Sequence, residues 1–86
     1  MNIKILGSGC QNCKKLYENA KDAVKASQID AIIDYVTDFK EIANYNLMRT
    51  PGLVINEKVV SYGKVCTKEE IVQLINQSML YEDINI

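Results

Sequence analysis

The chain has 86 residues, a formal net charge of −1, 48% hydrophobic residues, three cysteines and no histidine. A chain of this length forms one domain with a modest core, and its near-neutral charge argues against nucleic acid or an anionic membrane as a partner. The lack of histidine excludes a Cys–His catalytic pair and imidazole zinc ligands, and no apolar run approaches the ~18 residues of a membrane span.

The cysteine content and the first residues bear on the compartment. Three cysteines are too few, and odd in number, for the disulfide framework of a small secreted domain. The chain opens into a strand-like segment and not into the basic and hydrophobic regions of a signal peptide. We therefore expect a cytoplasmic protein, and we expect it to be a monomer without a cofactor.

The first elements expected along the chain are a strand, a helix and a second strand. Residues 3–6 form a short apolar run that stops at a glycine, which is typical of a buried strand. Residues 13–26 carry apolar side chains at helical spacing, and residues 31–36 again resemble a strand. This order indicates a right-handed crossover between two parallel strands.

A short second helix is expected next. Asp38 followed by Glu41 predicts an N-cap and its partner three residues later. The helix should end near Leu47, because Pro51 lacks a backbone donor and disfavours the α conformation at Thr50.

A hairpin and a third helix complete the predicted order. Two short apolar runs, residues 53–55 and 59–61, flank a turn and predict antiparallel strands. Thr67 and Glu70 repeat the capping pattern before a final helix. Residues 81–86 show no clear period, so we assign residues 1–80 to one domain and residues 81–86 to a tail that frays.

The cysteines of the motif Gly9-Cys10-Gln11-Asn12-Cys13 stand where the first strand ends and the first helix begins. The first-turn N–H groups of a helix have no internal acceptor, and the aligned peptide dipoles place partial positive charge there. Both effects favour the thiolate form of Cys10. Cys13, one turn further in, is positioned to attack a mixed disulfide formed at Cys10. The pair is therefore predicted to be a dithiol–disulfide couple.

This order of elements, the CxxC motif and the step Thr50-Pro51 together resemble the thioredoxin-like superfamily. The chain is most similar to its small redox-active disulfide proteins from archaea and anaerobic bacteria. The resemblance implies an α/β fold of the minimal thioredoxin type, β-α-β-α-β-β-α, with a four-stranded mixed sheet in the order 2-1-3-4. It also implies that Pro51 is cis and lies against the CxxC motif, and that Thr50 and Gly63 bind substrate.

The implied function is thiol–disulfide oxidoreductase, acting on protein or small-molecule disulfides and re-reduced by a thioredoxin-reductase-like partner. The spacer Gln11-Asn12 differs from that of thioredoxin, and Lys4 stands where thioredoxin has a buried acid. We expect Lys4 to reach solvent and not to serve the thiols. Lys68 stands where glutaredoxins have an aspartate, which places glutathione as a cosubstrate in doubt.

An alternative remains for the same two cysteines. Heavy-metal-associated domains also place a CxxC after a first strand, and a cysteine pair suits Cu(I), so the chain could instead be a soft-metal chaperone. Those domains run β-α-β-β-α-β. The third cysteine, Cys66, is expected to be a small buried residue near a helix cap, with a redox role as the alternative.

Overall fold

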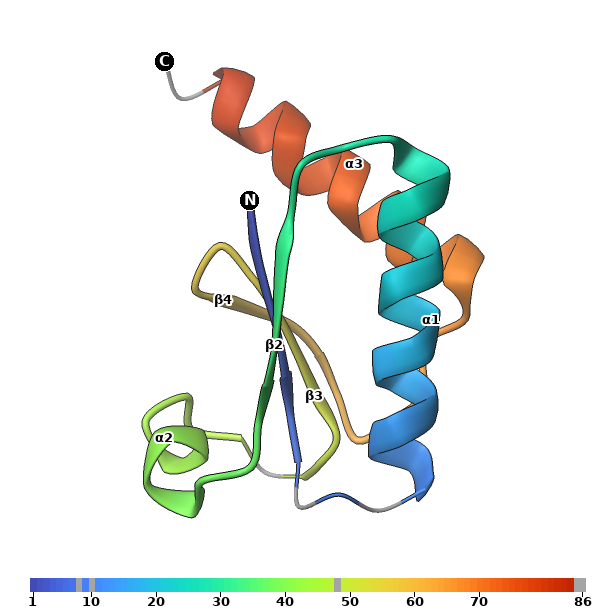
Figure 1. Cartoon of the computed structure of the whole chain (residues 1–86). Coiled ribbons are helices and arrows are strands. Elements are labelled where there is room, and N and C mark those ends of the chain that lie inside the picture. Colours follow the sequence, from blue (N-terminus) through green and yellow to red (C-terminus); the bar gives the residue numbers. More distant parts are fainter. Residues whose placement is uncertain (8, 10, 48, 85–86) are drawn as a thin grey trace.

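The structure is a computed structural model, and it describes residues 1–7, 9, 11–47 and 49–84, with side chains through residue 79. Within these ranges the elements follow the order β-α-β-α-β-β-α (Figure 1). The strands are β1 (Asn2–Leu6), β2 (Ile32–Val36), β3 (Gly52–Ile55) and β4 (Lys58–Tyr62), and the helices are α1 (Gln11–Ser27), α2 (Phe39–Ala43) and α3 (Lys68–Ile84). The predicted order is confirmed, and it differs from that of heavy-metal-associated domains.

The strands form one mixed sheet in the order β2-β1-β3-β4. β1 pairs in parallel with β2 and antiparallel with β3, and β3 pairs antiparallel with β4. A parallel pair needs a crossover connection, which α1 supplies between β1 and β2. The sheet order and the α/β fold class implied by the resemblance are therefore confirmed.

The helices divide between the two faces of the sheet (Figure 1). α1 and α3 pack against each other on one face, and α2 lies on the other. The alternation of side chains along β1 produces this division: Ile3 and Ile5 enter the core under α1 and α3, whereas Leu6 enters the smaller core under α2. In the described part of the chain, no helix has both the length and the apolar character needed to cross a membrane.

α2 is shorter than the sequence predicts, because it ends at Ala43 and not near Leu47. Its N-cap is Asp38, as predicted, and the Asp38 carboxylate accepts a 2.9 Å hydrogen bond from the backbone nitrogen of Lys40. Asn46 has a φ of 55°, in the left-handed region that asparagine tolerates better than most residues. The chain therefore leaves the helical conformation before the proline can end the helix.

α3 begins as predicted and extends further than predicted. The backbone nitrogen of Glu70 donates to Oγ1 of Thr67, and the backbone nitrogen of Thr67 donates to Oε1 of Glu70, both at 3.1 Å. These reciprocal bonds form a capping box. The helix continues to Ile84 although residues 81–84 lack a hydrophobic period, because no glycine or proline interrupts it and each added residue gains a hydrogen bond. The domain boundary at residue 80 stays a prediction.

β3 and β4 form the predicted hairpin through a two-residue turn, Asn56-Glu57. The φ angles of these residues are 50° and 68°. Positive φ at both central residues is characteristic of the type I′ turn, whose twist matches that of the strands. Lys58, which the sequence placed in the turn, is the first residue of β4.

Candidate functional site

Cys13 lies in the first turn of α1, and its side chain is 0% exposed. It is buried with Leu16 and Ala20, which follow it at helical spacing on the inner face of the helix. The predicted location of the CxxC motif is confirmed to this extent: β1 ends at Leu6 and α1 begins at Gln11. Cys10 lies outside the residues that the structure describes, and its role as the attacking thiol stays a prediction.

The sulfur of Cys13 lies against the backbone of Gly7. A Cβ atom at position 7 would overlap Cys13 Sγ, and it would stand 3.1 Å from Cys13 Cβ and 4.0 Å from Pro51 Cα. The Gly7 backbone is held in place because its nitrogen donates a 3.0 Å hydrogen bond to the carbonyl oxygen of Val36 at the end of β2. Cys13, Gly7 and Pro51 therefore meet at the edge of the sheet where β1 and β2 end.

Pro51 is buried, and its peptide bond with Thr50 is cis, as the resemblance implies. The carbonyl oxygen of Pro51 accepts a 2.9 Å hydrogen bond from the backbone nitrogen of Gly63. Gly63 has a φ of 74°, in the left-handed region that favours glycine. The structure thus joins Gly63 to Pro51, which lies near Gly7 and Cys13, and Thr50 is exposed next to Pro51. A substrate-binding role for these three residues stays a prediction.

Comparison with known proteins shows the family of the chain. Residues 1–76 match a family model described as a thioredoxin domain. The chain belongs to the thioredoxin family. A thioredoxin of Methanothermobacter thermautotrophicus is 37% identical over 76 residues, which cover 88% of this chain and 99% of that protein. A thioredoxin of Methanocaldococcus jannaschii is 45% identical over 69 residues, which cover 80% of this chain and 79% of that protein.

Membership of the thioredoxin family confirms the resemblance on which the sequence-based expectations rest. It also supports a role in thiol–disulfide oxidoreduction. The match covers β1 through most of α3, so it includes the CxxC motif, the Thr50-Pro51 step and Gly63.

In this thioredoxin-family protein, Lys4 belongs to a polar cluster with Tyr45 and Glu57. It lies on the face of the sheet covered by α2, where its Nζ atom donates a 2.8 Å hydrogen bond to the Tyr45 hydroxyl and lies 3.1 Å from Oε1 of Glu57. The Tyr45 hydroxyl donates in turn to Oε2 of Glu57 at 3.0 Å. The hydrogen bonds to Tyr45 and Glu57 raise the pKa of Lys4, and the bonds from Lys4 and Tyr45 lower the pKa of Glu57. The cluster joins β1 to the β3–β4 turn.

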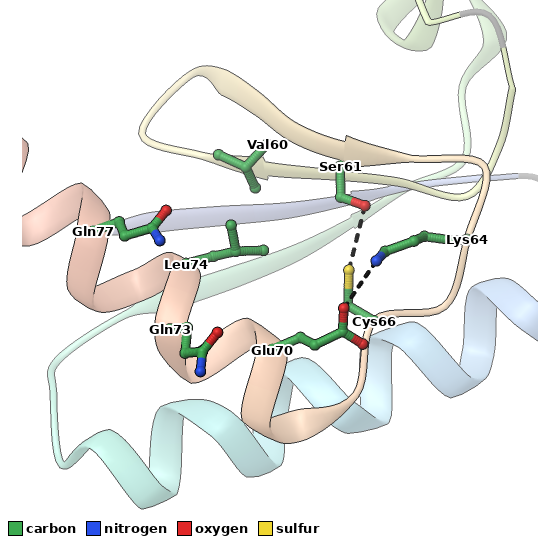
Figure 2. Close-up of a pocket in the computed structure, with 8 residues that line it drawn as sticks. All are labelled: Val60, Ser61, Lys64, Cys66, Glu70, Gln73, Leu74 and Gln77. Carbon is green, nitrogen blue, oxygen red and sulfur yellow. Dashed lines mark hydrogen bonds and ion pairs between the residues drawn. The ribbon is translucent and has the colours of Figure 1, made fainter.

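Cys66 is 1% exposed and lies two residues before the start of α3, next to the N-cap Thr67 (Figure 2). Its S–H group donates to Oγ of Ser61 at 3.3 Å, and its carbonyl oxygen accepts a 2.9 Å hydrogen bond from Nδ2 of Asn19. It lines a pocket of about 160 Å³ between β4 and α3, beside the 2.8 Å ion pair of Lys64 with Glu70. Cys66 is thus the small buried residue near a helix cap that the sequence predicts.

The metal-binding alternative concerns the arrangement of histidine, cysteine and acidic side chains. Outside the gaps at residues 8, 10, 48 and 85–86, no group of three or more histidine, cysteine or acidic side chains is arranged to hold a metal ion. A two-cysteine Cu(I) site would consist of Cys10 and Cys13, and Cys10 lies outside the described residues.

The sequence patterns did not single out Arg49, which the structure places at the site. Its side chain lies across Gly63: a Cβ atom on the glycine would stand 3.2 Å from Arg49 Cβ and 3.3 Å from Arg49 Cδ. In the sequence, the feature that indicates a position near the site is that Arg49 stands two residues before Pro51, in the segment Arg49-Thr50-Pro51.

Proposed function

We propose that the protein is a thiol–disulfide oxidoreductase whose Cys10–Cys13 pair exchanges electrons with disulfides of proteins or small molecules. The observation that carries the proposal is the Cys13 sulfur, buried in the first turn of α1 against Gly7 and near Pro51. A fully buried thiol does not meet an external substrate. It can, however, attack a mixed disulfide on a cysteine three residues away in the same chain.

The proposed reaction has two exchange steps. The Cys10 thiolate attacks one sulfur of the substrate disulfide, a bond forms between the two sulfurs, and the other substrate sulfur leaves as a thiolate that takes up a proton. The Cys13 thiolate then attacks Cys10, which releases the second substrate thiol and leaves a Cys10–Cys13 disulfide. Two electrons have passed from the protein to the substrate. A reductase of the thioredoxin-reductase type would return two electrons and two protons to the pair.

Thr50, Pro51 and Gly63 are proposed to bind the backbone of the substrate next to the cysteines. The N–H group of Gly63 already donates to Pro51 and the Arg49 side chain covers the glycine, so Gly63 would act mainly by holding Pro51 and Arg49 in place beside the substrate. Pro51 shapes the wall of the groove beside Gly7 and restricts access of metals to the thiols. Thr50, exposed at the same place, would offer its backbone to an extended substrate segment.

The remaining partners and the compartment are also proposals. Lys68, where glutaredoxins have an aspartate, makes glutathione a doubtful cosubstrate. The net charge of −1 gives no reason to expect nucleic acid or a membrane as a partner, and the odd, small number of cysteines fits a reducing cytoplasm. We expect the protein to act as a monomer.

A trapping experiment tests the mechanism. In Cys13→Ser the mixed disulfide at Cys10 has no resolving thiol and should accumulate on protein substrates, whereas Cys10→Ser should trap none. Cys66→Ser is the matched control, and it should reduce an insulin-type disulfide substrate at the rate of the unmodified protein. Full reductase activity in both Cys10→Ser and Cys13→Ser would overturn the dithiol mechanism.

A Cu(I) competition titration separates this function from soft-metal carriage. A metal chaperone would bind Cu(I) tightly through Cys10 and Cys13 and would not need to reduce disulfides. The titration is run beside the insulin-type assay on the same preparation. Tight Cu(I) binding together with no reductase activity would establish the chaperone function in place of the proposed one.

A further inference from the structure

Three exposed basic residues lie close in the chain to Cys13 or Pro51 of the proposed site. Lys14 and Lys15 directly follow Cys13 at the start of α1, and both are exposed. The first turn of α1 contains no acidic residue. Arg49 is also exposed and lies two residues before Pro51. We call Lys14, Lys15 and Arg49 the basic rim.

Arg49 is positioned by Gly63. The aliphatic part of the Arg49 side chain occupies the space above the glycine, where a Cβ atom would stand only 3.2 Å from Arg49 Cβ. Gly63 is tied in turn to Pro51 by a 2.9 Å hydrogen bond, and Pro51 lies beside Gly7 and Cys13. A continuous series of contacts therefore connects Arg49 with the buried thiol.

The basic rim is not neutralised within the described side chains. The ion pairs found there join Lys4 to Glu57, Lys21 to Glu18 and Lys64 to Glu70, and none includes a residue of the rim. Glu70 is already occupied by Lys64 at 2.8 Å. Asp38, which caps α2 after the end of β2, keeps its negative charge, but none of these ion pairs joins it to the rim. A chain with a net charge of −1 thus carries positive side chains without ion-pair partners at positions that follow Cys13 or precede Pro51.

We propose that the basic rim selects peptide disulfides whose cysteines are flanked by aspartate or glutamate. This inference rests on the proposed disulfide exchange and names the substrate class of the same site. Unpaired surface charges raise the local concentration of an oppositely charged partner and accelerate encounter by ~10-fold or more at low ionic strength. The rim would thus favour the first exchange step for acidic substrates and disfavour it for basic ones.

The test uses three disulfide-bonded peptides that differ only in the residues beside one cysteine: glutamates, glutamines or lysines. Rate constants for their reduction are measured in roughly 0.01 M salt, where the Debye length is ~30 Å, and in roughly 1 M salt, where it is ~3 Å. In low salt the acidic peptide should react about 10-fold faster than the basic one, with the neutral peptide between them. In high salt the three rates should converge.

Substitutions in the basic rim test whether its charges cause the selectivity. Replacement of all three residues, Lys14→Gln, Lys15→Gln and Arg49→Gln, should reduce the ratio of acidic to basic rates to about one in low salt. Lys25→Gln is the matched control, because Lys25 is exposed in the last turn of the same helix, and it should keep the full ratio. If the neutral peptide is reduced but the acidic and basic peptides react equally, the rim proposal fails and the proposed function stands. If none of the peptides is reduced, the proposed function fails and the rim proposal fails with it.

Discussion

The sulfur of Cys13 and the backbone of Gly7 are so close that position 7 has no room for a side chain. Gly7 also donates a hydrogen bond to Val36, which holds its backbone against the end of β2. The Cys13 sulfur therefore occupies a space that a side chain at position 7, directly after β1, would fill. This contact joins the sheet to the first turn of α1 at the proposed site.

Gly7→Ala should consequently destabilise the protein. The added methyl group must displace Cys13, and overpacking of this kind costs about 1–3 kcal/mol. Disulfide reductase activity should fall as well, because the displaced thiol is the one proposed to resolve the mixed disulfide. Chemical denaturation and an insulin-type reduction assay measure the two effects.

A double-mutant cycle provides the control for this prediction. In a Cys13→Ala background the sulfur is gone, so Gly7→Ala should cost less than it does in the unmodified protein. The same cost in both backgrounds would show that the overlap with the Cys13 sulfur is not the cause.

The burial of two cysteines predicts an order of alkylation. Cys13 is 0% exposed and Cys66 is 1% exposed, so both should react with a thiol reagent only when the native structure opens. Cys10, the proposed attacking thiol, should be modified first and at lower pH. Peptide mapping after short labelling times measures the order, with denatured protein as the control in which all three react. Faster labelling of Cys13 or Cys66 in native protein would contradict the assigned roles.

The capping box of α3 predicts a stability effect remote from the site. Thr67→Ala removes the hydroxyl that accepts from the Glu70 nitrogen, and loss of such a cap costs about 1 kcal/mol. Lys68→Ala is the neighbouring control, because Lys68 is exposed and should tolerate the change within about 0.5 kcal/mol. Urea denaturation compares the two variants. An equal effect of both would argue against the cap as a source of stability.

The Lys4–Tyr45–Glu57 cluster predicts a dependence of stability on pH. Contacts with Lys4 and Tyr45 lower the pKa of Glu57, so its stabilising contribution is complete above the unfolded-state value of about 4.3 and disappears as pH falls through the lower folded-state value. The pKa of Lys4 is raised, so its contribution to stability is complete below the unfolded-state value of about 10.4 and is lost as pH rises through the higher folded-state value.

Comparison of the unmodified protein with Glu57→Gln tests this. The difference in free energy of unfolding should be small, because the Glu57 side chain is 60% exposed, and constant between about pH 5 and pH 10. It should shrink as pH falls below about 4. A difference that grows in acid would contradict the assigned direction.

The sequence by itself determined the order of the elements, the location of the CxxC motif at a strand-to-helix junction, and the N-caps Asp38 and Thr67. Each of these depends on hydrophobic periodicity or on hydrogen bonds between residues a few positions apart. The resemblance carried by the CxxC motif and the Thr50-Pro51 step added the sheet order. The inferences about the elements and their caps succeeded because short segments of the sequence determine local geometry.

Only the tertiary structure decided which distant residues meet. Three contacts depend on how β1, β3 and β4 are aligned. They are the contact of Cys13 with Gly7 near Pro51, the ion pair of Lys4 with Glu57, and the packing of Arg49 over Gly63. Strand register fixes such contacts, and a shift of one residue would turn every side chain to the opposite face. No local pattern at Arg49 or Lys4 contains that register, so their partners became known only when the sheet was assembled.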